Sequence, residues 1–307
     1  MSLAFVFPGQ GSQSLGMLSS FADEAIVQST FLEASKVLGY DMWQLCQQGP
    51  ESDLGITYKT QPALLTASVA LFRLWQSRQG NAPAFLAGHS LGEYSALVCA
   101  GVLSFTDAVR LVEARGKFMQ EAVPEGQGKM AAILGLDDAD IRTACDEASQ
   151  GEVVAPVNFN SPGQVVIAGN AAAVERAMDA CKAKGAKRAL PLNVSAPSHC
   201  ALMKPAAEKL KNLLDTLSLT TPSIPVVNNV DVSIENDISK IKDALVRQLY
   251  NPVRWTETVQ ALAENGVTHI IECGSGAVLA GLTKRINKEL TASSIQELSA
   301  FDSAIKA

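Results

Sequence analysis

Residues 84–101 constrain the fold most strongly, because they predict a β-strand that turns directly into an α-helix. The apolar stretch AFLA precedes the pentapeptide GHSLG (88–92), and LGEYSALVCA follows it up to Gly101. Small residues on both sides of a serine let the backbone bend sharply and expose the hydroxyl group. The pattern therefore predicts a nucleophile elbow that carries Ser90, with a structural serine in a tight turn as the alternative.

Short apolar strands alternate with helical patterns in the first part of the chain. Residues 3–7 (LAFVF) read as a buried strand, and the strongest helical pattern covers 61–76. A capping box that begins at Ser104 opens a further helix over 105–119. Strands that alternate with helices in this way predict a parallel sheet.

The pattern changes after a Pro- and Gly-rich connection at 123–129. From there to residue 194 the order is strand, helix, strand, strand, helix, strand, which is the ferredoxin-like arrangement. The first pattern then resumes with a helix at 199–217, a strand at 223–227, a helix at 239–250 and a strand at 267–272, while the tail after 290 carries little signal. We therefore predict an α/β fold: a hydrolase-like parallel-sheet core formed by residues 1–124 and 195–307, with an inserted ferredoxin-like small domain at 125–194.

Charge and composition argue against several classes of function. The net charge is −6, so there is no overall basic field for nucleic acid. The first cation is Lys36 and no long uncharged apolar run exists, which predicts neither an export signal nor a membrane span and favours the cytoplasm. The six cysteines are scattered without a C-x-x-C motif, so we expect free thiols and no metal site.

Only three histidines can serve as the base for Ser90. His89 adjoins Ser90 in the turn, where neighbouring side chains point apart, and His269 lies within a predicted strand. His199 comes at the predicted beginning of a helix, where the positive end of the helix dipole favours the neutral imidazole that a general base needs. We therefore expect His199 to be the base.

An imidazole base needs a group that orients it, and no aspartate stands out. Gln248 falls on the apolar stripe of the helix at 239–250, three residues after Leu245. A buried amide requires hydrogen-bond partners. Gln248 is therefore a candidate to hold His199, although ordinary backbone partners would satisfy it equally well.

Arg115 lies on the apolar side of the helix at 105–119, in series with Leu111 and Val112. A charge there is costly unless it is paired. One explanation is a structural salt bridge. The other is a substrate carboxylate, which the planar guanidinium would grip through two parallel hydrogen bonds.

The glycine-rich segment FPGQGSQ follows the first predicted strand. The backbone N–H groups of Gln10 and Leu91 could together form an oxyanion hole, since such sites combine a donor after the nucleophile with one from a neighbouring loop. A phosphate-binding loop is the competing interpretation, but the segment lacks G-K-[ST]. A plain glycine-rich turn remains open.

Several separated motifs together resemble those of the malonyl-CoA:acyl carrier protein transacylase family of bacterial fatty acid synthesis. They are FPGQGSQ, GHSLGEYSA around Ser90, VEARGKFMQEAV with Arg115, NFNSPGQVVIAG and SAPSHCALM, in the family's order from residue 4 to 290. The resemblance implies ping-pong transfer of a malonyl group from coenzyme A to the phosphopantetheine thiol of acyl carrier protein, with no cofactor. One departure is Gly274-Ser275-Gly276, where the family often has G-P-G.

By this resemblance, Ser90 is the nucleophile, His199 the base, and Gln248 the group that orients the base. Gln10 and Leu91 would supply the oxyanion hole, and Arg115 would bind the malonyl carboxylate. A basic cluster in the predicted small domain is a candidate docking patch for the acidic carrier protein, although such residues also suit a helix C-terminus; it consists of Lys182, Lys184, Lys187 and Arg188. We expect a monomer.

Two other functions fit parts of the same pattern. A serine esterase or thioesterase would share the nucleophile, the base and the oxyanion hole, and would differ in admitting water to the acyl-enzyme. A non-catalytic module that binds carrier protein would need none of these three groups. The sequence does not separate a malonyl from a methylmalonyl substrate, because a methyl group changes binding by only about 1–3 kcal/mol.

Overall fold

The computed structural model describes residues 2–194 and 196–306. Within them, a five-stranded sheet has the strand order β7-β2-β1-β8-β9. All neighbouring strands of this sheet run parallel. The strands are β1 (Leu3–Phe7), β2 (Phe85–Gly88), β7 (Val226–Val227), β8 (His269–Glu272) and β9 (Thr291–Ser294). Because β1 is central, the loops after β1, β2 and β8 lie side by side at one edge of the sheet.

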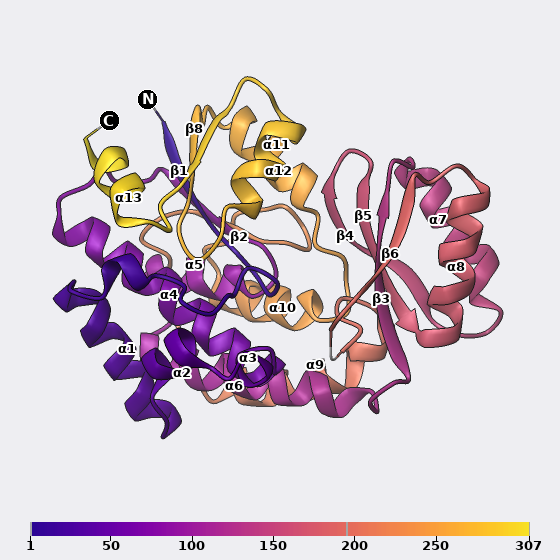
Figure 1. Cartoon of the computed structure of the whole chain (residues 1–307), viewed down its shortest axis with the longest axis horizontal. Helices are drawn as coiled ribbons and strands as arrows, with labels where there is room; N and C mark the ends of the chain where they lie inside the picture. Colours follow the sequence, from indigo (N-terminus) through magenta and orange to yellow (C-terminus); the bar gives the residue numbers. More distant parts are fainter. Residues whose placement is uncertain (1, 195, 307) are drawn as a thin grey trace.

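Helices cover both faces of this sheet (Figure 1). Successive side chains of a strand point to opposite faces, and in β1 the side chains of Phe5 and Phe7 join one core cluster while Ala4 and Val6 join another. The first cluster packs against α1 (Ala25–Leu38), α2 (Met42–Gln48), α3 (Glu51–Leu54), α4 (Thr57–Ser77), α6 (Phe105–Ala122), α9 (Lys204–Asp215) and α10 (Ile238–Gln248). The second packs against α11 (Trp255–Glu264) and α12 (Val278–Ile286).

A separate antiparallel sheet has the strand order β4-β5-β3-β6. It consists of β3 (Gly128–Leu134), β4 (Val154–Ser161), β5 (Gln164–Asn170) and β6 (Arg188–Leu192), and α7 (Asp138–Ser149) and α8 (Ala171–Ala183) cover one face. We call these six elements the small subdomain; it stands beside the parallel sheet in Figure 1. Val253, just before α11, pairs with β4 through hydrogen bonds with Val157 and Phe159, so that β4 is tied to the larger part.

The predicted mixture of a parallel sheet and a separate small sheet is confirmed, and most element bounds agree with the sequence patterns. The tail is different from expectation: it forms β9 and then α13 (Leu298–Ile305). Phe301 of α13 is fully buried and packs edge-to-face on Phe21 and Trp75. None of the helices described is long and apolar enough to cross a membrane.

Two elements near the predicted site are shorter than expected. The strand predicted over 223–227 is reduced to Val226–Val227. The helix predicted from His199 begins later, with a 3-10 turn at Ala201–Met203 followed by α9. His199 itself has a φ of +63°, outside the helical region, because its backbone N–H is drawn to the carbonyl oxygen of Leu249 at 3.0 Å.

Candidate active site

Ser90 occupies a sharp bend between β2, which ends at Gly88, and α5 (Gly92–Cys99). Its φ is +53°, a conformation that non-glycine residues seldom adopt. A Cβ atom on Gly88 would lie 1.8 Å from the backbone of Gly92, and one on Gly92 would lie 2.0 Å from the carbonyl oxygen of Phe7. Both glycines are therefore required by close backbone approach, which is the physical reason for the G-x-S-x-G spacing.

Two side chains from distant parts of the chain hold the strained backbone of Ser90. Its N–H donates to Oδ1 of Asn229 at 2.7 Å, and its carbonyl oxygen accepts from Nε2 of Gln248 at 3.0 Å. Asn229 also donates from Nδ2 to the carbonyl oxygen of Gly88 at 2.6 Å. A strained backbone conformation persists where the surrounding contacts hold it, and here both the N–H and the carbonyl group of Ser90 are held.

His199 lies against the serine hydroxyl group. Its Nε2 is 2.7 Å from Oγ of Ser90, and its Nδ1 is 2.7 Å from the carbonyl oxygen of Gln248. Since a carbonyl oxygen can only accept a hydrogen bond, Nδ1 carries the proton and Nε2 is left to accept from the serine. This is the tautomer that a general base for Ser90 requires.

The surroundings of His199 favour its neutral form. The side chain is 3% exposed. Burial, and to a smaller extent the nearby Arg115 guanidinium, lowers its pKa from 6.5 to about 3, while the hydrogen bond to Gln248 acts in the opposite direction. The imidazole is therefore unprotonated throughout the neutral range and free to accept a proton.

Arg115 points toward Ser90 from α6 and is 1% exposed. Its Nη1 donates to Oε1 of Gln61 at 2.8 Å, and its Nη2 donates to Oε1 of Gln248 at 3.0 Å. The same Nη2 lies 3.4 Å from Oγ of Ser90. The guanidinium also stacks over the ring of Tyr94, 5.2 Å from the ring centroid.

The partners of Arg115 are all neutral. Among residues 2–194 and 196–306, no carboxylate oxygen lies within 4.0 Å of the guanidinium, and Nε has no hydrogen-bond partner. A structural salt bridge, one of the two explanations open from the sequence, is thus not formed by any described residue. Burial lowers the pKa of Arg115 from its ordinary value of 12.5, but an arginine remains charged in proteins.

Gln248 lies against His199, and the group that contacts the imidazole is its backbone carbonyl and not the side-chain amide that the helix pattern singled out. The side chain faces the other way. Its Oε1 accepts from Arg115, and its Nε2 donates both to the carbonyl oxygen of Ser90 and to Oε2 of Glu93 at 2.9 Å. Gln248 thus contacts the base with its main chain and the guanidinium with its side chain.

A cavity of about 280 Å³ opens beside Ser90. Strand residues of the small subdomain and loop and helix residues of the larger part line it, among them Gln10, Leu91, Met130, Val166, His199 and Leu279. The backbone N–H groups of Gln10 and Leu91 donate to no acceptor within the part of the chain that the structure describes. The side-chain amide of Gln10 donates to Oγ1 of Thr57 at 3.2 Å, which fixes the loop after β1.

The other two histidines lie apart from the serine hydroxyl group. The ring of His89 is 2.8 Å from Oδ1 of Asn160 and packs on Trp255, so it joins the elbow to β4. His269 is bonded to the hydroxyl of Thr291 between β8 and β9. The structure brings together Ser90, His199, Arg115, Gln248, Gln10 and Leu91; His89 lines the same cavity without contacting the serine hydroxyl, and His269 is not among the lining residues.

The basic cluster lies at the far end of the small subdomain. Lys182 pairs with Asp179 at 3.2 Å and Lys184 with Glu147 at 3.3 Å. The other two cations, Lys187 and Arg188, are exposed. Arg188 begins β6, whereas Leu192 at the end of the same strand lines the cavity. The cluster is thus about 13 Å along the strand from the cavity.

Three polar residues of the site were missed by the sequence patterns: Gln61, Glu93 and Asn229. All three are buried. Asn229 lies two residues after the end of β7, and polar side chains after the carboxyl ends of parallel strands commonly form the site in such a fold. That rule could have singled out Asn229, whereas nothing in the local pattern distinguished Gln61 or Glu93.

The geometry agrees with what comparisons with known proteins show. Residues 4–300 match the acyl transferase domain family. A malonyl CoA-acyl carrier protein transacylase of Escherichia coli (strain K12) is 66% identical over 304 residues, which cover 99% of this chain and 98% of that protein. The protein of the same name from Bacillus subtilis (strain 168) is 45% identical over 306 residues, covering 99% and 96%.

Solved structures give the same result. A malonyl-transacylase in complex with a type II PKS acyl-carrier protein has a TM-score of 0.99 and 61% identity, covering 100% of this chain and 99% of that chain. An acyl carrier protein S-malonyltransferase from Vibrio cholerae has a TM-score of 0.97 and 60% identity, covering 99% of both chains. The chain belongs to the malonyl CoA-acyl carrier protein transacylase family.

Proposed function

We propose that this enzyme moves a malonyl group from coenzyme A to the phosphopantetheine thiol of acyl carrier protein, through an ester on Ser90, in fatty acid biosynthesis. The observation that carries the proposal is the position of Oγ of Ser90, which lies 2.7 Å from Nε2 of His199 and 3.4 Å from Nη2 of Arg115. A nucleophile with a neutral base on one side and a buried cation on the other suits an acyl group that ends in a carboxylate.

The first half-reaction begins as Nε2 of His199 takes the hydroxyl proton of Ser90. The serine oxygen bonds to the thioester carbonyl carbon, the carbon–sulfur bond breaks, and the coenzyme A thiol leaves with the proton from His199. In the second half-reaction the carrier-protein thiol gives its proton to His199 and attacks the ester, and Ser90 regains the proton. The carbonyl oxygen of Gln248 orients the imidazole throughout and supports its charged form.

The developing oxyanion would be bound by the backbone N–H groups of Gln10 and Leu91. Support comes from their positions on the cavity, after β1 and β2 respectively. Leu91 also directly precedes α5, where the positive end of the helix dipole adds to the donor. Removing one such donor typically lowers turnover by about 100- to 1000-fold.

Arg115 would bind the free carboxylate of the malonyl group. Its guanidinium is buried at the reacting centre, and the described partners leave Nε unpaired. A substrate carboxylate would supply both the missing acceptor and the missing counter-charge.

The finer description of the fold belongs to the same proposal. We propose that residues 1–124 and 195–307 form a hydrolase-like core and that 125–194 form a ferredoxin-like domain. The strand–serine–helix elbow on a parallel sheet supports the first part. The order β3-α7-β4-β5-α8-β6 in an antiparallel sheet supports the second.

We further propose a cytoplasmic monomer that needs no cofactor, with malonyl-CoA and acyl carrier protein as its partners. The chemistry of acyl exchange supports a reaction without a cofactor, because each proton and electron pair in the two half-reactions is supplied by Ser90, His199 and the thiols. The six cysteines are free, as is usual in a reducing compartment.

Labelling with malonyl-CoA tests the proposal. The enzyme, mixed with malonyl-CoA and no acceptor, should gain the mass of one malonyl group on Ser90 and should lose it when holo-acyl carrier protein is added. Ser90→Ala should take up no label. Acetyl- and methylmalonyl-CoA, run in parallel, measure the selectivity for the acyl group.

The two alternatives give different results in the same experiment. Rapid release of free malonate without an acceptor would favour an esterase or thioesterase. Full transfer by Ser90→Ala would exclude the seryl ester, and no transfer by the wild-type protein would favour a non-catalytic module that binds carrier protein.

A further inference from the structure

We infer that Glu93 is a positioning residue of the active site: its carboxyl group accepts hydrogen bonds from the side-chain amide of Gln248, which contacts Arg115, and from the backbone N–H of Asn229, whose side chain holds the Ser90 backbone. Glu93 contacts neither the serine hydroxyl nor the base. It is the second residue of α5, is 3% exposed, and belongs to no described ion pair. The inference rests on the proposed function, since it concerns the recognition of the malonyl group.

The first contact orients Gln248. Nε2 of Gln248 donates to Oε2 of Glu93 at 2.9 Å. Since a carboxylate oxygen accepts and an amide nitrogen donates, this contact turns the nitrogen of the amide toward Glu93 and the oxygen toward Arg115. Oε1 of Gln248 then receives Nη2 of Arg115 at 3.0 Å. Glu93 thus acts on the guanidinium through one intervening amide.

The second contact orients Asn229. The backbone N–H of Asn229 donates to the same oxygen, Oε2 of Glu93, at 2.9 Å. The side chain of Asn229 holds the N–H of Ser90 and the carbonyl oxygen of Gly88. One carboxyl oxygen therefore contacts two segments beside the elbow, the one after β7 and the end of α10.

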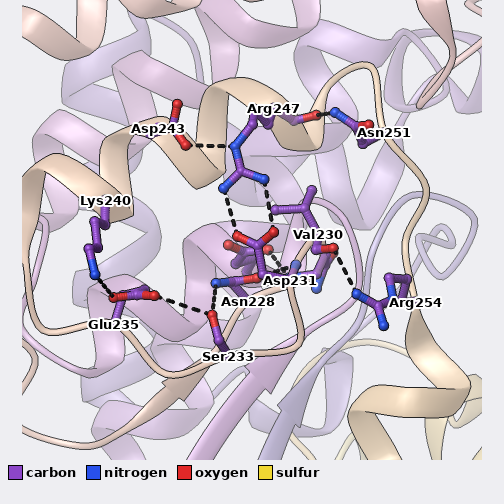
Figure 2. Close-up of polar contacts among 12 residues, drawn as sticks. Asn228, Val230, Asp231, Ser233, Glu235, Lys240, Asp243, Arg247, Asn251 and Arg254 are labelled. Atoms are coloured by element: carbon purple, nitrogen blue, oxygen red, sulfur yellow. Dashed lines mark hydrogen bonds and ion pairs between the residues drawn. The ribbon is translucent and has the colours of Figure 1, made fainter.

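An ion pair on the surface joins the same two segments from outside. Arg247, the neighbour of Gln248, makes a two-pronged contact with Asp231 at 2.9 and 2.6 Å (Figure 2). Asp231 follows Asn229 by two residues, and its N–H donates to Oδ1 of Asn228 at 2.8 Å. The outer pair also joins the two segments, so what is particular to Glu93 is its two buried contacts, with the side-chain amide of Gln248 and with the backbone N–H of Asn229.

The positioning role holds whether or not Glu93 is ionised. Burial raises its pKa to about 7, and its hydrogen bonds with Gln248 and Asn229 act against this rise. Both observed contacts are donors that point at Oε2, and that oxygen still accepts when a proton resides on Oε1. The positioning role therefore depends on where the accepting oxygen of Glu93 lies, and the charge of its carboxyl group is secondary.

Two substitutions separate the place of the acceptor from its charge. Glu93→Gln keeps an oxygen at the same reach and removes the charge, and Glu93 lines a small cavity of about 10 Å³. Glu93→Asp keeps the charge and withdraws the oxygens by about 1.5 Å, which takes them beyond hydrogen-bond distance of both donors. Positioning predicts that the glutamine variant is the more active of the two.

The measurement is kcat/KM for malonyl and for acetyl transfer on the same preparations. In Glu93→Asp, malonyl transfer should fall about 10- to 100-fold, the loss that a misplacement of about 1 Å produces. Acetyl transfer should fall less, because it does not use Arg115, so the malonyl-to-acetyl ratio should fall severalfold. Glu93→Gln should keep both the rate and the ratio close to those of the wild type. Because both substrates are tested on one sample, a partly unfolded preparation does not alter the ratio.

Glu272→Gln is the matched control. Glu272 is another buried carboxyl group of the core, its pKa is also raised to about 7 by burial, and it accepts from the N–H of Ala280 at 2.8 Å. Its substitution should leave the malonyl-to-acetyl ratio unchanged.

Two results would overturn the role of Glu93: a glutamine variant as impaired as the aspartate variant, or an aspartate variant whose ratio equals that of the wild type. A wild-type enzyme that takes no malonyl group on Ser90 would instead overturn the proposed function. The two failures are therefore distinguishable in one series.

Discussion

The reacting pair and the recognition group that we propose for this site are built differently, although both are buried around Ser90. The reacting pair is complete: Ser90 contacts His199, and His199 contacts a backbone carbonyl, at 2.7 Å in each case. Arg115 has only neutral partners, and one of its N–H groups has no partner among the described residues. His199 thus has its hydrogen-bond partners without a ligand, whereas Arg115 lacks an acceptor that a ligand can provide.

The difference shows how one site can combine reactivity with selectivity. A backbone carbonyl holds the imidazole without adding a charge, and burial keeps the imidazole neutral. A direct carboxylate partner for Arg115 would compete with a substrate carboxylate for the same two donors. The amides of Gln61 and Gln248 hold the guanidinium in place without neutralising it.

Arg115→Ala is expected to give the largest effect that separates the recognition group from the reacting pair. Malonyl transfer should fall about 100-fold or more in kcat/KM, because a buried charge pair with the substrate is lost. Acetyl transfer, which brings no carboxylate to Arg115, should change far less. Steady-state kinetics with both acyl-CoA substrates measure this.

Arg110→Ala is the matched control, since Arg110 lies on the same helix but is exposed and pairs only with Asp107. It should leave both rates unchanged. Equal losses of malonyl and acetyl transfer in Arg115→Ala would contradict the assignment of the guanidinium to the carboxylate.

A second, smaller effect concerns the pH dependence of stability. The pKa of His199 is about 3 in the folded protein and 6.5 ordinarily, so between these values the unfolded chain binds a proton that the folded protein does not. The free energy of unfolding must therefore fall as the pH drops below 6.5. From pH 7 to pH 5 the wild type should lose about 2 kcal/mol relative to His199→Gln, which carries no titrating group there.

Chemical denaturation of both proteins at the two pH values measures this difference. Comparing the two proteins removes the opposite contribution of Glu93 and Glu272, whose raised pKa values favour folding as the pH falls. An identical pH dependence of both proteins would show that His199 is not buried in its neutral form.

Periodicity and turn residues predicted most of the fold, but not the tail. The edge strand Thr291–Ser294 has no apolar alternation, and its residues are exposed or half-buried. The helix Leu298–Ile305 packs through Phe301 onto residues from the beginning of the chain. Both elements form through contacts with distant residues, which a local pattern does not contain.

The same limit of local patterns explains which residues of the site could be predicted from the sequence. The local sequence pattern singles out Ser90 and Arg115. Ser90 is flanked by the glycines of the elbow, and Arg115 is a charge on an apolar helix stripe. Gln248 was singled out for its side chain, yet its backbone carbonyl makes the contact with His199. Glu93 looks like an ordinary acidic residue in the first turn of a helix, which favours such residues anyway. Its two contacts join segments that only the tertiary structure brings together.

The smallest effect is expected where the charges are exposed, in the basic cluster of the small subdomain. Lys182 and Lys184 already have carboxylate partners, which leaves Lys187 and Arg188 as candidates for docking the carrier protein. Reversing both, with Lys187→Glu and Arg188→Glu, should raise the KM for acyl carrier protein about threefold, since rim charges act mainly on association. Loading from malonyl-CoA should be unaffected, because the cluster lies away from the cavity.

The matched control reverses two exposed lysines of the larger part, Lys36 on α1 and Lys211 on α9. It changes the net charge by the same amount, so it separates a local docking patch from general repulsion between two acidic proteins. If the basic cluster docks the carrier protein, KM should rise only for the reversal at Lys187 and Arg188. A wild-type KM that falls when salt is added would argue against such docking. Equal increases in both double variants would assign the effect to net charge, and the selectivity of this enzyme for its partner would then have to come from the apolar and polar surface nearer the cavity.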